Sequence, residues 1–269
     1  MCEGTFLRKP GRSYLFAPAD RLDRAEKALL SAADAVVVDL EDGVGLSDKA
    51  ACREALTAWT ASRPYLLRIN AAGTDDHELD LVLLAGLSNV DGVVLPKSER
   101  ADDVRRVADR LPAGARIYAL VESAAGLLAA PEIARSGVER LMFGPLDYAA
   151  DLSAAPTREL LAFAQSSLVV ASAAARLAPP VDGPTVSLDD PEATRADAEL
   201  ARSLGFAGKL CIHPSQIEAV NSVFSPTAAE VEWARGVVDA ARGGAVVAHE
   251  GTMIDAPVLR RAHRILGVA

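Results

Sequence analysis

The sequence is poor in aromatic residues and in cysteine, and both shortages restrict what the protein can be. Only 4% of the 269 residues are aromatic while 50% are hydrophobic, so the interior must be built mainly from Ala, Val and Leu. That composition is typical of α/β folds with many short helices. The three cysteines are scattered, and none belongs to a Cys-x-x-Cys pair. We therefore expect neither a disulfide framework nor a zinc site, and a reduced, cytoplasmic compartment.

Basic residues and long apolar runs are also scarce. The 28 Lys and Arg residues are outnumbered by 37 Asp and Glu residues, and the formal net charge is −9. No basic stripe in the sequence would release counterions from phosphates, so nucleic acid is not an expected partner. No apolar run approaches the length of a membrane span, and the first residues are too polar for a signal peptide. A membrane is therefore not expected as a partner either.

What the sequence does contain is a regular alternation of strand-like and helix-like segments. The strand-like runs lie at residues 13–16, 35–40, 65–70, 92–95, 117–121, 140–143, 180–182 and 208–212, the seventh being weak. Eight strand–helix units in roughly 225 residues correspond to the number and size of a closed (β/α)8 TIM barrel. An open doubly wound sheet is the alternative. It is weakened because Ala17-Pro18-Ala19-Asp20, and not a Gly-x-Gly-x-x-Gly loop, follows the first strand.

The barrel prediction divides the chain into two parts. Residues 1–225 form the barrel, a catalytic domain, and residues 226–269 form a C-terminal helical extension that packs on the barrel or on a neighbouring subunit. The extension holds two helical segments, broken at Gly243-Gly244. Within the barrel, we expect Asp20 to cap the first helix, because an Asp side chain accepts hydrogen bonds from the free N–H groups of a helix start.

Two strands of the predicted barrel deliver a carboxylate to the same edge. The apolar run Ile117–Val121 stops on Glu122, and the strand at residues 140–143 is followed by a loop that contains Asp147. In a parallel barrel the carboxyl ends of the strands form the active-site face. Two convergent carboxylates there suit a hard divalent cation, most simply Mg²⁺. The plain alternative is that each acid is only solvated.

Arg68 interrupts an otherwise apolar strand, between Leu67 and Ile69. A buried guanidinium needs an anionic partner, which gives two interpretations. One is an internal salt bridge with Glu41 or Glu122, and the other is a bidentate clamp on a substrate carboxylate. A metal, a carboxylate clamp and spare acids fit a carbon–carbon lyase or aldolase, in which Mg²⁺ polarises a carbonyl.

Eight sequence blocks, in order over nearly the whole chain, resemble the citrate lyase β-subunit-like family of the HpcH/HpaI aldolase superfamily. The blocks are FAPADR (16–21), DLEDGV (39–44), LRIN (67–70), LPK (95–97), ALVES (119–123), GPLDYAADL (144–152), CIHPSQI (211–217) and MIDAP (253–257). Several of these blocks are specific in combination, though none is specific alone. In one place the chain departs from the pattern: Ser153-Ala154-Ala155 stands where the family usually has glycines, which leaves the shape of the acyl pocket open.

The resemblance implies a fold, a reaction and a set of site residues. It implies a (β/α)8 barrel that assembles as a homotrimer or a dimer of trimers. It also implies a Mg²⁺-dependent carbon–carbon lyase (EC 4.1.3-like) that cleaves or forms a 3-hydroxyacyl-CoA thioester such as citryl-, malyl- or citramalyl-CoA, with coenzyme A as part of the substrate. Carried over by position, Glu122 and Asp147 bind the metal, Arg68 clamps the carboxylate, and Asp255 reaches into a neighbouring subunit's site as a catalytic residue.

Other polar residues at the strand ends have more than one interpretation. We expect Glu41, Asp42 and Lys97 to bind substrate together with Arg68 and Glu122. Lys97 either lies near the phosphates of coenzyme A or forms a Schiff base. The remaining candidates have plainer interpretations: a helix start for His213, a helix cap or a supporting acid for Asp151, and a solvated face for Arg21, Lys49 and Arg53.

Two other functions remain as alternatives. A class II pyruvate aldolase that cleaves a hydroxy-keto acid normally needs a His base near its metal, and no His adjoins Glu122 or Asp147 in the sequence. A non-catalytic subunit of a larger lyase complex is the other alternative. The intact set of Arg68, Glu122 and Asp147 argues against it.

Overall fold

The computed structural model of the chain describes residues 11–87, 89–112, 114–241, 248–249 and 252–267. Contacts between residues divide the chain into two compact units. The larger unit, Pro10–Phe224, carries the sheet, and the smaller one contains Ser225–Ala269.

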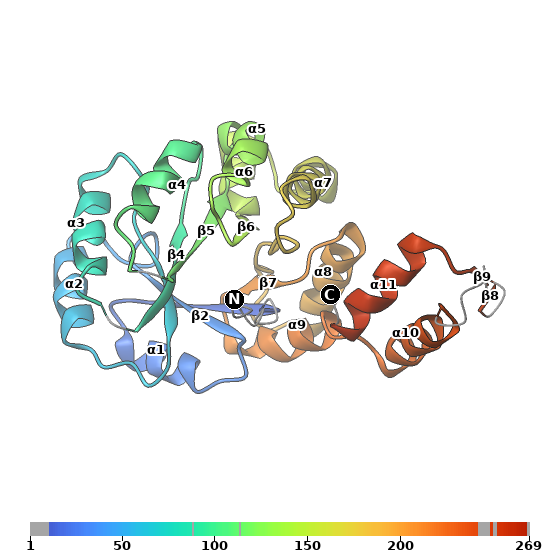
Figure 1. Cartoon of the computed structure of the whole chain (residues 1–269). Coiled ribbons are helices and arrows are strands. Elements are labelled where there is room, and N and C mark those ends of the chain that lie inside the picture. Colours follow the sequence, from blue (N-terminus) through green and yellow to red (C-terminus); the bar gives the residue numbers. More distant parts are fainter. Residues whose placement is uncertain (1–10, 88, 113, 242–247, 250–251, 268–269) are drawn as a thin grey trace, which may run out of the picture. The chain divides into compact units, whose positions relative to one another are not determined.

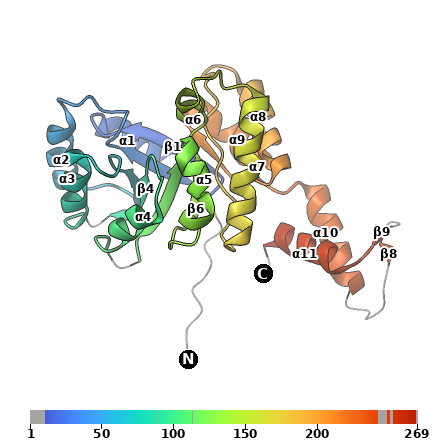
Figure 2. The same ribbon diagram turned by 90° about the horizontal axis from the view of Figure 1, so that it is seen from above.

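The larger unit is an α/β fold built on a curled sheet of seven parallel strands, with helices on its outer side (Figures 1 and 2). The strands are β1 (Ser13–Pro18), β2 (Ala35–Asp39), β3 (Tyr65–Arg68), β4 (Val90–Leu95), β5 (Arg116–Val121), β6 (Arg140–Phe143) and β7 (Lys209–Cys211). Their order in the sheet is β6-β5-β4-β3-β2-β1-β7, so each strand from β1 to β6 lies beside its neighbour in sequence. The predicted parallel alternation is confirmed for these seven strands.

Helices follow most of the strands, as the predicted alternation of strand-like and helix-like segments requires. In the larger unit they are α1 (Leu22–Leu29), α2 (Lys49–Ala58), α3 (Asp75–Leu84), α4 (Ala101–Ala108), α5 (Ala124–Ile133), α6 (Pro145–Asp151), α7 (Arg158–Ala174), α8 (Pro191–Leu204) and α9 (Ile217–Val223), with a short 3-10 turn η1 at Pro214–Gln216. The prediction that Asp20 caps the first helix is wrong. Arg21 occupies the cap position without a side-chain hydrogen bond, because α1 begins at Leu22 and Asp20 lies one residue too early.

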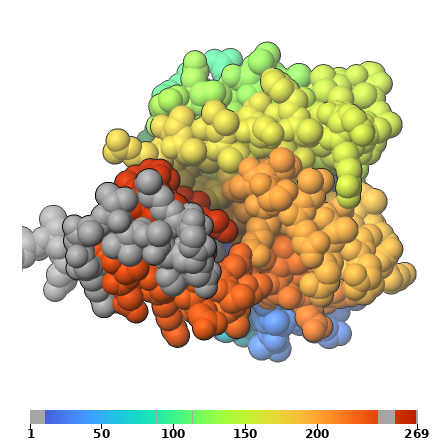
Figure 3. Space-filling model, turned by 90° about the vertical axis from the view of Figure 1, so that its right-hand side faces the viewer, coloured from blue at the N-terminus to red at the C-terminus, as the bar shows by residue number. Residues whose placement is uncertain are grey.

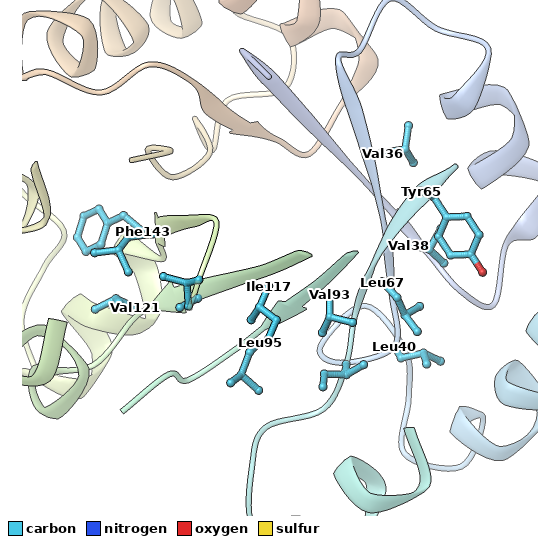
Figure 4. Packing of buried hydrophobic residues seen from close by; sticks show 14 of the residues in the cluster. Val36, Val38, Leu40, Tyr65, Leu67, Val93, Leu95, Ile117, Val121 and Phe143 are labelled. Carbon is cyan, nitrogen blue, oxygen red and sulfur yellow. The ribbon is translucent and has the colours of Figure 1, made fainter. Parts of the chain in front are cut away.

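Both faces of the sheet are buried, and side chains alternate between them along each strand. The outer face packs against the helices through residues such as Val38, Leu67 and Val93, which lie side by side on the neighbouring strands β2, β3 and β4 (Figure 4). The inner face holds a second apolar set, which we call the inner cluster: Tyr14, Val37, Leu66, Val94, Tyr118, Leu120, Met142, Val181 and Leu210. This cluster draws on all seven strands, because the sheet curls around it.

The predicted seventh strand is reduced to two bridges between the edge strands. Val181 bridges Met142 of β6, and Asp182 bridges Lys209 of β7, both in parallel orientation. The hydrogen bonds are short: Val181 donates to Leu141 O at 3.0 Å, and Leu210 donates to Asp182 O at 2.8 Å. A longer strand cannot form, because Pro179-Pro180 and Pro184 flank the segment and lack the N–H groups of a ladder. Helices α7 and α8 contact each other outside this region (Figure 3).

The smaller unit is a helical pair with a short hairpin. Helices α10 (Ala228–Ala241) and α11 (Ala256–Leu266) pack through Ala234, Val237 and Ala262, and the Arg261 guanidinium lies 4.8 Å from the centre of the Trp233 ring. Strands β8 (Ala248–His249) and β9 (Thr252–Met253) pair antiparallel. The predicted break at Gly243-Gly244 lies outside the described residues. In the described part of the chain, no helix has the length and apolar character that crossing a membrane requires.

Candidate active site at the carboxyl edge of the sheet

A cavity of about 300 Å³ opens at the carboxyl ends of the strands, on the inner side of the sheet. Its polar lining consists of Asp39, Asp42, Arg68, Glu122 and Asp147. Its apolar lining consists of Phe16, Leu120, Leu146, Pro184, Leu210 and Ile212, together with residues of the loops after β2 and β6. Of the strand-end residues predicted to carry the chemistry, Asp42, Arg68, Glu122 and Asp147 line this pocket, whereas Glu41 and Lys97 do not belong to its lining.

The two-residue repeat of the strands explains how these residues reach the pocket. Asp39, Arg68 and Glu122 each follow an inner-cluster residue by two positions, namely Val37, Leu66 and Leu120. Each side chain therefore continues the inner face past the apolar layer. Phe16 and Ile212 follow Tyr14 and Leu210 in the same way, and sequence analysis overlooked them as lining residues. The strand repeat was the signal that would have found them.

A second, larger groove lies on the outer surface. It has a volume of about 450 Å³ and is lined by Glu99, Arg100, Ala101, Asp102, Arg105, Glu132 and Arg135. Arg105 and Asp102 form an exposed ion pair there, and none of the acids of the inner pocket reaches this groove. Its charges fit an ordinary solvated surface, so the inner pocket is the candidate site.

Arg68 is held by acids of the neighbouring strand. Asp39 and Arg68 are partners in the register of β2 and β3, which places their side chains next to each other on the inner face. Arg68 Nε donates to Asp39 Oδ1 at 2.7 Å and Nη2 donates to Oδ2 at 2.6 Å, while Nη1 lies 3.0 Å from Glu41 Oε2. Burial disfavours the Arg68 cation, but the hydrogen bond and charge of Asp39 outweigh it and raise the pKa of Arg68.

The Asp39 carboxylate is fixed from the other side by backbone groups. The N–H groups of Glu41 and Gly43 donate to its two oxygens, each at 2.9 Å. A side chain at position 43 would collide with Asp39 Oδ2, so only glycine allows this approach. Of the five N–H groups of Arg68, Asp39 takes two and Glu41 faces one. The others, one on each terminal nitrogen, are available for a ligand.

Glu122 directly follows β5 and is almost completely buried, with 3% of its surface exposed. Its Oε1 accepts a hydrogen bond of 2.7 Å from the backbone N–H of Lys97. Burial raises the pKa of Glu122 to about 8, and the charges of Glu41 and Asp147 act in the same direction. The Lys97 N–H and the Arg68 cation oppose this shift without cancelling it. Glu122 is therefore a carboxylate in a site that lacks sufficient positive charge.

Asp147 lies exposed in the first turn of α6, which begins at Pro145 after β6. Its charge is one of the causes of the raised Glu122 pKa, so the two carboxylates affect each other. Oxygen donors of this kind fit a hard divalent cation, which would relieve their repulsion, while water or substrate would complete its coordination. Among the described residues, no group of three or more His, Cys, Asp or Glu side chains could hold a metal ion.

Lys97 is engaged by acids of the β2 loop. Its ammonium group forms an ion pair with Glu41 and lies 3.8 Å from Asp42. Burial works against the cation, but the hydrogen bond to Glu41 and the nearby carboxylates outweigh it and raise the pKa of Lys97. A Schiff base needs an unprotonated amine, so this environment argues against that interpretation.

The prediction of a solvated face for Arg21, Lys49 and Arg53 is correct only for Arg21. Lys49 is buried and donates to Asn70 Oδ1 and to Glu41 O, the latter at 3.3 Å. Arg53 is mostly buried and pairs with Asp80 at 2.7 Å. Asn70 lies two residues after β3 and Asp80 lies on α3, so the contacts of α2 with these two segments cover both cations. The sequence pattern of α2 did not show this burial, because long basic side chains usually reach water.

Three further residues have structural roles. Asp151, the last residue of α6, accepts through Oδ2 at 2.8 Å from Ala124 N, the first N–H group of α5, whose N-cap is Ser123. His213 caps η1, since its Nδ1 accepts from Ser215 N at 3.3 Å. Asp182 forms a buried ion pair of 2.7 Å with Lys209, away from the pocket lining.

Asp255 belongs to the smaller unit and caps α11. Its Oδ1 accepts from Val258 N at 3.0 Å, and Pro257 occupies the first turn. The side chain is exposed. This hydrogen bond gives Asp255 the role of a helix cap, while its catalytic role remains a prediction.

Comparison with known proteins gives a consistent assignment. The sequence profile "HpcH/HpaI aldolase/citrate lyase" matches residues 12–214. A citrate lyase subunit beta-like protein of Mycobacterium tuberculosis (strain ATCC 25618 / H37Rv) is 39% identical over 272 residues, covering 97% of this chain and 96% of that protein. A (3S)-malyl-CoA thioesterase of Cereibacter sphaeroides (strain ATCC 17025 / ATH 2.4.3) is 35% identical over 266 residues, covering 94% and 91%.

A solved structure agrees with these sequence matches. The crystal structure of protein CitE from Mycobacterium tuberculosis, in complex with magnesium, acetoacetate and coenzyme A, superposes with a TM-score of 0.84. It is 36% identical and covers 97% of this chain and 98% of its own. From the profile match over residues 12–214 and the identity over nearly the full length, the chain belongs to the HpcH/HpaI aldolase/citrate lyase family.

Proposed function

We propose that this protein is a Mg²⁺-dependent carbon–carbon lyase that acts on a 3-hydroxyacyl-CoA thioester such as citryl-, malyl- or citramalyl-CoA. The observation that carries the proposal is the pairing of Glu122 and Asp147 in one pocket with Arg68. It is supported by the related CitE structure, which holds magnesium, acetoacetate and coenzyme A.

In this proposal, Glu122 and Asp147 hold the metal. When bound, Mg²⁺ supplies a Lewis acid that polarises a substrate carbonyl. Arg68 binds the substrate carboxylate through the N–H groups that Asp39 and Glu41 leave available. The apolar wall of Phe16, Leu210 and Ile212 lies beside the acyl group and keeps water away from it.

Asp255 is proposed to move the proton of the reaction from a neighbouring copy of the chain. Support comes from its exposed carboxylate, which the short loop before Pro257 holds in place. The test mixes two variants, Asp255→Asn and Arg68→Ala, each inactive alone. Unfolded together and reassembled as mixed oligomers, they should regain partial activity. Failure to regain activity although hybrids form, or a monomeric protein, would exclude the shared site.

The proposal also includes a closed barrel fold, an oligomeric state and a cellular location. We describe the larger unit as a (β/α)8 barrel in which Val181–Asp182 acts as a minimal strand between β6 and β7, supported by the two bridges of that segment. Homotrimeric assembly and a cytoplasmic location are proposed with it, the latter supported by the buried free thiols of Cys52 and Cys211.

A thioesterase reaction is the second candidate, because a (3S)-malyl-CoA thioesterase is among the similar proteins. The two reactions leave different products. Hydrolysis of malyl-CoA gives malate and free coenzyme A, whereas carbon–carbon cleavage gives an acyl-CoA and a carbonyl compound. Product analysis by mass spectrometry after one turnover separates them.

The deciding experiment screens 3-hydroxyacyl-CoA esters with and without Mg²⁺. We expect cleavage of at least one ester with Mg²⁺ and none in excess EDTA. Full activity in EDTA would exclude the metal mechanism. Cleavage of free hydroxy-keto acids alone would favour the pyruvate aldolase, and no turnover of any ester would favour a non-catalytic subunit.

A further inference from the structure

The geometry points to Lys97 as a positioning residue for Glu122: the left-handed backbone at Lys97 aims its N–H at one carboxylate oxygen and so orients the proposed metal ligand. This inference rests on the proposed metal site. It differs from the predicted role of Lys97 in substrate binding, because here the backbone of the residue acts and not its ammonium group.

The backbone at Lys97 is unusual. Its φ is +46°, in the left-handed region that L-residues other than glycine, asparagine and aspartate seldom occupy. Such conformations are unfavourable for residues with a Cβ and persist only where the surroundings enforce them. The chain turns sharply here, so that the Lys97 N–H donates to Glu122 Oε1 at 2.7 Å while the following N–H, that of Ser98, donates to Leu120 O.

Ser98 is the neighbour that enforces this backbone. It is buried, its N–H donates to Leu120 O on β5 at 3.0 Å, and its hydroxyl donates to Leu95 O at 2.8 Å. Gly126 approaches closely from α5: a Cβ there would lie 2.5 Å from Ser98 O. The turn after β4 is therefore fastened both to its own strand and to the strand that carries Glu122.

The opposite side of Glu122 lies against Gly144. A Cβ at position 144 would lie 2.5 Å from Glu122 Oε2 and 2.6 Å from its Cβ. The Glu122 carboxylate is thus confined between the Lys97 N–H on one oxygen and the bare Gly144 backbone on the other. The loops after β4 and β6 therefore determine where this carboxylate points.

The test compares variants that all remove the ammonium group but differ in how they tolerate a positive φ. Lys97→Gly accepts it freely, Lys97→Met tolerates it about as lysine does, and Lys97→Val disfavours it because of its branched Cβ. Mn²⁺ serves as a paramagnetic substitute for Mg²⁺, and its dissociation constant is measured by electron paramagnetic resonance without substrate. Thermal unfolding is recorded in parallel.

We expect Lys97→Gly and Lys97→Met to bind Mn²⁺ within about twofold of each other, and Lys97→Val to bind about tenfold more weakly, the range found for supporting groups around metal ligands. Lys97→Ala, which disfavours a positive φ less than valine does, replaces Lys97→Val if that variant does not fold, with a smaller loss in the same direction. Gly144→Ala should also weaken Mn²⁺ binding, because its methyl group displaces Glu122.

Failure of the inference and failure of the metal site give different results. If Glu122→Gln abolishes Mn²⁺ binding while the glycine and valine variants (or glycine and alanine) bind equally, the metal site stands and the positioning role is wrong. If wild-type protein binds no Mn²⁺, or if Glu122→Gln binds it as well as wild type, both are wrong. A change in melting temperature alone, without a change in Mn²⁺ affinity, would make Lys97 merely structural.

Discussion

Two pairs of acids lie at the same edge of the sheet, and the structure treats them differently. Asp39 and Glu41, after β2, lie against the cations of Arg68 and Lys97. Glu122 and Asp147, after β5 and β6, have no Lys or Arg within ion-pair distance among the described residues. Both pairs face one cavity or its rim, and in sequence both look alike: an acid just after an apolar run.

This difference suggests separate roles: Asp39 and Glu41 support other side chains, and Glu122 and Asp147 are proposed to take part in the chemistry. The first pair uses its charge within the protein, where it fixes a guanidinium. The second pair lacks an ion-pair partner among the described residues, and the raised pKa of Glu122 reflects that imbalance. In the proposed mechanism a bound cation balances these two acids, and an acid at a strand end serves as a metal ligand where no basic residue of a neighbouring strand has already neutralised it.

The largest effect should come from changes to Glu122 and Asp147, the pair without an ion-pair partner. We expect Asp147→Asn and Glu122→Gln to lower turnover below detection and to abolish Mg²⁺ binding, measured by calorimetry, with the fold retained. The matched controls are Asp109→Asn and Glu139→Gln, exposed acids near the opposite edge of the sheet. Wild-type activity in either site variant would end the distinction between the two pairs.

The next largest effect should come from breaking the ion pair between Asp39 and Arg68. Asp39→Asn should lower the free energy of unfolding by about 3–5 kcal/mol, because it leaves a buried guanidinium without its main partner. Urea unfolding measures this loss, with Asp109→Asn as the control. A loss no larger than that of the control would mean that the Asp39–Arg68 pair contributes little to stability.

The variant Arg68→Lys should distinguish the two interpretations of Arg68, a clamp on the substrate carboxylate and an internal salt bridge. Lysine keeps the charge but not the planar fork, so the substrate KM should rise about tenfold or more, as expected for losing one charged hydrogen bond of about 1.5–3 kcal/mol. Steady-state kinetics measure KM, and thermal unfolding reports the pair with Asp39. A lower melting temperature with unchanged KM would restrict Arg68 to the internal salt bridge.

A smaller, pH-dependent effect concerns stability without metal. Burial and nearby carboxylates raise the pKa of Glu122 from 4.5 to about 8, so the folded state holds a proton that the unfolded state releases between these values. Stability from this group is therefore complete below pH 4.5 and is lost as the pH rises through 8. Glu122→Gln should melt higher than wild type at pH 8.5, with little difference at pH 4.5. Glu139→Gln is the control, and an advantage independent of pH would contradict the assignment.

The smallest expected effect is a negative one at Lys97. Because its carboxylate neighbours raise the pKa of Lys97, its ammonium group should not form a Schiff base. Borohydride added during turnover should leave the mass of the protein unchanged and the activity undiminished. Substrate trapped covalently on Lys97 would show that Lys97 forms a Schiff base and takes part in the chemistry.

The sequence alone determined the parallel strands and the edge at which the polar residues gather. Apolar runs of strand length between amphipathic helices define β1 to β6, and the two-residue repeat sends Asp39, Arg68 and Glu122 to one face. The carboxyl-edge position of Asp147 follows from the same alternation. These features depend on local spacing, which a sequence displays directly.

Only the tertiary structure decided which acids are neutralised and which backbone groups hold the rest. The Asp39–Arg68 pair depends on the register between β2 and β3, and the buried Lys49 of α2 reaches Asn70 in the segment just after β3. The Lys97 N–H reaches Glu122 because the Ser98 N–H, by donating to Leu120 O, holds the loop after β4 against β5. Which acids are neutralised and how the Glu122 carboxylate is oriented depend on contacts between segments distant in sequence, so a local sequence pattern does not reveal them.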